Sequence, residues 1–162
     1  MDTDEGLYHA VPQTRGKIAH HTIDTKTASN RKQDLISFPV YSTEYKLMGK
    51  VDIYRQKDKT LIERKYQLKQ IYQGQIYQLW AQYFCLIEMG YEVDKIAFYE
   101  ISTNKMIPVP LPSDEDIIKF KTLIEHFHNF NPIDNFPVNP NKCKHCVYCS
   151  LCDKTNEENV YQ

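Results

Sequence analysis

The sequence lacks any hydrophobic run long enough to cross a bilayer. No apolar segment approaches the roughly 20 residues of a membrane-spanning helix, and no secretory hydrophobic region follows Met1. It also lacks an excess of positive charge, because 20 Lys and Arg face 21 Asp and Glu. We therefore expect a cytoplasmic protein without a membrane partner, in which contact with nucleic acid would depend on local basic clusters or on bound metal ions.

Cysteine is absent from the chain before Cys85. The other four cysteines lie within ten residues near the end, each three residues after the last. Thiols of a cytoplasmic protein stay reduced, so this pattern indicates metal or redox chemistry rather than disulfides. Cys85 stands alone in an apolar segment, which favours a core position. The four clustered residues are Cys143, Cys146, Cys149 and Cys152.

Four thiolates in a tight loop bind a soft ion or an iron–sulfur cluster. Structural zinc is the alternative, because sites of four cysteines commonly hold it. Zinc sites, however, usually separate two CxxC pairs by a longer spacer, and this chain has none. The spacing favours an iron–sulfur cluster, with His145 as a weaker candidate ligand.

The length of 162 residues suits one domain with a real core, and there are no internal repeats. We expect a poorly ordered, possibly truncated N-terminus over 1–15, a core over 16–130, and a linker with the cysteine tail over 131–162. The order of elements predicts an α/β protein with a mixed sheet flanked by helices. Strands are expected at 35–41, 50–54, 61–66, 95–101 and 106–111, and helices at 69–91 and 113–130.

A β-hairpin is predicted over 49–69, because two alternating runs flank a polar turn. A turn centred on residues 57–58 would place Asp52 directly opposite Glu63, with side chains roughly 5 Å apart. Lys65 would project on the same face as Glu63. Two facing carboxylates repel each other unless a cation lies between them. The alternative is a surface strand with solvated charges.

Carboxylate oxygens suit Mg²⁺ or Mn²⁺, and such a metal beside a lysine suits hydrolysis of a phosphodiester. Gln75, Gln78 and Gln82 lie along one side of the predicted helix over 69–91. They indicate either a solvated helix face or, for Gln78, a hydrogen bond to the hairpin site. His20 and His21 point in different directions, so at most one would reach a shared site.

These motifs together resemble the CRISPR-associated exonuclease family four (Cas-four), RecB-like nucleases of the PD-(D/E)xK superfamily. The similarity runs from Gly16 to Cys152, and five motifs in order make it specific. Its segments are Gly16-x-x-x-His20, Gly49-Lys50-Val51-Asp52, Glu63-Arg64-Lys65, Gln78 placed as in a Q-x-x-x-Y motif, and the cysteine spacing Cys143-x₂-Cys146-x₅-Cys152.

The resemblance implies a restriction-endonuclease-like fold and a 5′-to-3′ exonuclease acting on single-stranded or splayed DNA ends. Such enzymes trim prespacers for CRISPR adaptation together with the integrase complex. His20, Asp52, Glu63 and the main-chain carbonyl of Arg64 would hold Mg²⁺ or Mn²⁺. Lys65 would orient the attacking water, and Gln78 would support the site.

Two positions depart from the family pattern. Gln82 stands where the motif has tyrosine, with Tyr83 next to it. The family's first cluster cysteine, which precedes the histidine motif, has no counterpart, so Cys149 is the candidate fourth ligand of a 4Fe-4S cluster. Two other hypotheses stay open: a catalytically weak DNA-binding or scaffold subunit, and a cluster-based redox or structural protein.

Overall fold

A computed structural model describes residues 34–131, 138–146 and 148–152. These residues fall into two compact units, one ending at His128 and the other beginning at Asn129. In the described ranges, no helix combines the length and the apolar character that a bilayer crossing requires.

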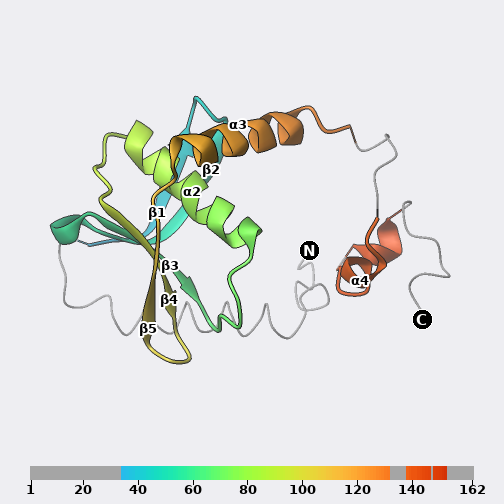
Figure 1. Cartoon of the computed structure of the whole chain (residues 1–162), viewed down its shortest axis with the longest axis horizontal. Helices are drawn as coiled ribbons and strands as arrows, with labels where there is room; N and C mark the ends of the chain where they lie inside the picture. Colours follow the sequence, from blue (N-terminus) through green and yellow to red (C-terminus); the bar gives the residue numbers. More distant parts are fainter. Residues whose placement is uncertain (1–33, 132–137, 147, 153–162) are drawn as a thin grey trace, which may run out of the picture. The chain divides into compact units, whose positions relative to one another are not determined.

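The larger unit is built on a five-stranded mixed sheet (Figure 1). Its strands follow one another in space in the order β1-β2-β3-β4-β5. Only β3 and β4 run parallel; the other neighbours are antiparallel. This confirms the predicted mixed sheet flanked by helices. The strands are β1 (Asp34–Ser42), β2 (Leu47–Arg55), β3 (Thr60–Lys65), β4 (Lys95–Glu100) and β5 (Lys105–Val109).

The predicted hairpin is present as β2 and β3. A single 3₁₀ turn over Gln56–Asp58 joins the strands, and Lys59 leaves it with a positive φ of 49°. The observed register pairs Ile53 with Ile62 and Arg55 with Thr60. The observed pairing ends at Ile53 and Ile62, one step before the predicted pair of Asp52 and Glu63.

Helix α2 (Gln73–Glu88) connects β3 to β4 and passes over the strands (Figure 1). Its predicted start near residue 69 is wrong by four residues. The backbone N–H of Leu68 donates to the Glu100 carboxylate, which holds this segment outside the helix. The N–H of Tyr72 then donates to Gln75 Oε1 at the true start. Gly90, with φ 87°, follows the helix end as a C-terminal glycine should.

Helix α3 (Asp114–His128) begins with a capping box. The Asp116 carboxylate accepts hydrogen bonds from the N–H and hydroxyl of Ser113, and the Ser113 hydroxyl accepts the N–H of Asp116. On its inner side, Phe120 is buried and its ring lies 5.2 Å from the ring of Phe84. This contact fixes α3 against α2.

The core lies between α2 and the sheet. Leu79 and Leu86 of α2 meet Leu61 of β3 and Phe98 of β4 in one buried cluster. Each side chain of this kind stabilises the fold by about 1.5–3 kcal/mol when fully buried. The helix is therefore held at a defined height and rotation above β3, which is what positions its polar side chains.

The smaller unit contains helix α4 (Pro140–Cys143) and a 3₁₀ turn over Cys149–Leu151. The Asn139 side chain accepts the backbone N–H groups of Asn141 and Lys142, which caps the short helix. Residues 132–137 of the predicted linker lie outside the described ranges.

Candidate functional site

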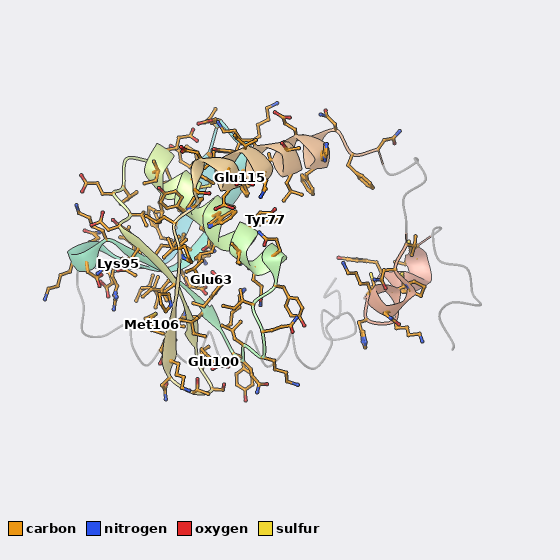
Figure 2. The ribbon with its side chains drawn as sticks, viewed as in Figure 1. Glu63, Tyr77, Lys95, Glu100, Met106 and Glu115 are labelled. Carbon is orange, nitrogen blue, oxygen red and sulfur yellow. The ribbon has the colours of Figure 1, made fainter. Side chains whose placement is uncertain are left out.

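Glu63 is the centre of a polar cluster beneath α2. Figure 2 shows it among the strands where the helix passes over them. Its side chain is buried, with 4% of the residue exposed. Oε1 accepts hydrogen bonds from Lys65 Nζ at 2.9 Å and Gln78 Nε2 at 2.7 Å. Oε2 accepts one from Gln82 Nε2 at 2.8 Å. A buried carboxylate needs such donors, because an unpaired charge in the interior is costly.

The two glutamines lie one helical turn apart on α2. Residues at i and i+4 share a face, so Gln78 and Gln82 reach down to the same carboxylate. Gln78 also accepts a hydrogen bond from Lys65 Nζ at 2.9 Å. The expectation of a solvated glutamine face is wrong for Gln82, which is only 6% exposed. Sequence reasoning missed Gln82 as a partner of Glu63, although its i, i+4 spacing from Gln78 was the available signal.

Asp52 of β2 contacts β3 at Arg64, the residue that follows Glu63. Asp52 Oδ2 accepts the backbone N–H of Arg64 at 2.8 Å. The Arg64 guanidinium, whose side chain is 1% exposed, lies 4.0 Å from Asp52 Oδ1. In a regular antiparallel ladder this N–H would bond to the main chain of Val51, two steps beyond Ile53. The Asp52 carboxylate takes that place, where the pairing of β2 with β3 has ended.

The carbonyl of Arg64 points toward the same gap between the strands. In an extended strand the N–H and C=O of one residue point to the same side, and the N–H of Arg64 faces Asp52. The neighbouring Lys65 carbonyl faces the other way, toward the end of β4, where it accepts the N–H of Ile101 at 2.9 Å. Glu63 and Arg64 are thus neighbours on β3, and the N–H and carbonyl of Arg64 both face the β2 strand that carries Asp52.

A pocket of about 170 Å³ adjoins the two glutamines. Its apolar walls come from Val40 and Leu47, and Lys50 lies at its edge. Cys85 also lines it. Burial, followed by the nearby charge of Glu88, raises the pKa of this thiol to about 11. Cys85 is therefore a protonated core residue at neutral pH, consistent with the prediction from the sequence.

The remaining predicted ligand, His20, lies outside the described residues. Within the described parts of the chain, no three side chains of His, Cys, Asp or Glu form a group that could hold a metal ion. The Glu63 cluster thus brings together Glu63, Lys65 and Gln78 through direct hydrogen bonds, whereas Asp52 joins it through the hairpin backbone.

The cysteines of the smaller unit are linked by successive tight turns. The N–H groups of Cys146, Cys149 and Cys152 each donate to the carbonyl of the cysteine three residues earlier, at 3.0, 3.2 and 3.2 Å. In such turns the side chains at i and i+3 lie on one side. Burial, followed by the charges of the other three cysteines, raises the pKa of the Cys143 thiol. The turns therefore link the four cysteines through the backbone, but within the described residues their side chains do not form a group that could hold a metal ion.

Comparison with known proteins supports the fold. No family model matches the chain, and no curated protein matches it. The crystal structure of SSO0001 is similar, with a TM-score of 0.59 and 18% sequence identity, over 91% of this chain and 73% of that chain. This similarity shows a shared α/β fold with a mixed sheet and flanking helices.

Proposed function

We propose that this chain is a metal-dependent DNA exonuclease with a restriction-endonuclease-like fold, as its resemblance to the Cas-four family suggests. It would act 5′-to-3′ on single-stranded or splayed ends, trim prespacers for CRISPR adaptation and work with the integrase complex. The observation that carries the proposal is the buried Glu63, which is hydrogen-bonded to Lys65 and stands next to Arg64, whose N–H donates to Asp52.

The donor set fits a hard divalent cation. A carboxylate offers about four lone-pair sites, and three donors are hydrogen-bonded to Glu63. One site is therefore left for a metal, and the carboxylate of Asp52 and the carbonyl of Arg64 would be further ligands. Oxygen ligands of this type suit Mg²⁺ or Mn²⁺, and His20 would complete the set. When bound, the ion would acidify a water and screen the negative charge that develops on the phosphate.

Lys65 would act directly on the substrate. Its ammonium group is held by Glu63 Oε1 and Gln78 Oε1, both at 2.9 Å. An ammonium has three donors, so one remains to bind a phosphate oxygen or to orient the attacking water. Gln78 positions this lysine and the carboxylate together, because its amide bonds to both.

The tail would hold an iron–sulfur cluster through Cys143, Cys146, Cys152 and the candidate fourth ligand Cys149. What supports this proposal is the run of successive turns that links the four cysteines and the electrostatic effect of three of them on Cys143; in the described residues the thiols themselves do not form a group that could hold a metal ion. A bound metal would reverse this effect, since it stabilises thiolates. Zinc remains the alternative cofactor for this set.

One observation favours a second function, that of a catalytically weak DNA-binding or scaffold subunit. Both oxygens of Glu63 are already engaged by cluster side chains. If those hydrogen bonds outcompete a cation, the site binds DNA without cutting it. Persistent DNA binding with no cleavage in Mn²⁺ or Mg²⁺ would support this reading.

A cleavage assay on end-labelled single-stranded DNA separates the two. We expect Mn²⁺-dependent shortening from the 5′ end by the wild type. Asp52→Ala, Glu63→Ala and Lys65→Ala should each lose more than about 100-fold in rate, beyond the effect of residues that only support a ligand. Glu92→Ala is the control, because Glu92 is an exposed acid paired with Lys59. Equal rates for all five proteins would reject the assignment.

A further inference from the structure

The second oxygen of the Glu63 carboxylate is held by Gln82, the residue that stands where the family motif has tyrosine. Gln82 Nε2 donates to Glu63 Oε2 at 2.8 Å, within the buried part of the cluster. We propose that Gln82 is a positioning residue, which together with Gln78 holds Glu63 by both oxygens so that it can bind a divalent cation. This inference rests on the proposed function of the site.

The orientation of the Gln82 amide is fixed by its two acceptors. Its Nε2 donates to Glu63 Oε2 and to the main-chain carbonyl of Lys50, at 3.2 Å. Turning the amide over would place Oε1 against two acceptors, which is repulsive. The amide therefore ties the carboxylate on β3 to the backbone of β2, across the two strands that carry the candidate ligands.

Packing alone does not account for a glutamine at this position. Gln82 Oε1 is buried and has no hydrogen-bond partner within the part of the chain that the structure describes. A buried acceptor without a partner is destabilising, and a methionine of similar length would avoid it. The glutamine therefore leaves a buried acceptor unpaired, and the hydrogen bond of its amide NH₂ to Glu63 explains why a glutamine stands there.

Gln78 and Gln82 hold the Glu63 carboxylate by both of its oxygens, an arrangement that we call the clamp. Gln78 donates to Oε1 and Gln82 to Oε2, and the two residues lie one helical turn apart on α2. Two donors on different oxygens fix the rotation of the carboxylate plane, which a single donor leaves free. Loss of a side chain that hydrogen-bonds to a metal ligand commonly weakens metal binding by about 10–100-fold.

Isothermal titration of the full chain with Mn²⁺ tests the clamp. We expect Gln82→Met to bind Mn²⁺ at the core site about 10–100-fold more weakly than the wild type. Gln73→Met is the matched control, because Gln73 is an exposed residue of the same helix, and it should bind like the wild type. Equal affinity of Gln82→Met and wild type would overturn the role of Gln82 alone. Absence of core Mn²⁺ binding in the wild type, judged against Glu63→Ala, would overturn the proposed function itself.

A measurement on the unmutated protein covers the case in which Gln82→Met does not fold. In a titration with diamagnetic Mg²⁺, the side-chain NH₂ resonances of Gln78 and Gln82 should both shift, while those of Gln73 stay in place. A saturating Mg²⁺ response at Gln78 without any change at Gln82 would overturn the clamp and leave the metal site standing.

Discussion

The two candidate sites of this protein are assembled in opposite ways. Glu63 meets Gln78 and Gln82 across 15 and 19 residues of chain, so its surroundings exist only once α2 packs on the sheet. The cysteines are brought together by hydrogen bonds between residues three apart. The first site depends on tertiary packing and the second on local backbone turns.

This difference decides what the sequence could predict. The hairpin of β2 and β3 followed from the alternating pattern and the short turn, because register in a hairpin is set by turn length. The facing of Asp52 and Glu63 stays a prediction, since the observed pairing ends at Ile53 and Ile62. The capping box of Ser113 and Asp116 is likewise formed by residues close in the sequence. The cysteine spacing also involves only nearby residues, but the metal or cluster binding that it predicts stays a prediction.

The remaining features required the folded core. Gln82 contacts Glu63 because Leu79 and Leu86 set the rotation of α2, and no local pattern reports that rotation. The start of α2 moved to Gln73 because the N–H of Leu68 is held by Glu100, which lies 32 residues away. Sequence reasoning fails where a distant partner competes with local helix propensity.

The largest effect of a substitution is expected in the cysteine tail, where it tests whether the locally linked site binds a cofactor. Anaerobically purified wild type should contain iron and acid-labile sulfide. Cys146→Ser should lose both, because it removes one thiolate from a local set of four. Cys85→Ala, which changes a buried thiol of the core, should retain them. Stoichiometric zinc in the wild type would reject the cluster, and full iron content in Cys146→Ser would reject the assignment of that ligand.

A smaller effect is expected in the larger unit, at a surface contact between residues 45 positions apart in the sequence. The Ser42 hydroxyl and the Thr43 N–H donate to the Glu88 carboxylate, and these hydrogen bonds lower its pKa from the ordinary 4.5. Because the pKa of Glu88 is lower in the folded than in the unfolded state, its carboxylate stabilises the folded protein at pH values above the unfolded pKa. This stabilisation is lost as the pH falls through the folded pKa.

Glu88→Gln should therefore lower the urea midpoint modestly at pH 7. It should also lose less stability than the wild type when the pH falls from 7 to below 4.5, because it has no such carboxylate to protonate. Midpoints measured at both pH values provide the test. Parallel losses in the two proteins would show that the contact contributes no pH dependence.

The most direct test of the central claim is to locate Mn²⁺ by anomalous diffraction from crystals grown with the ion. We predict a peak about 2.0–2.6 Å from oxygens of Glu63, Asp52 and the Arg64 carbonyl, within the range of hard-cation oxygen bonds. A crystal with ordered Mn²⁺ elsewhere and none beside Glu63 would contradict the account.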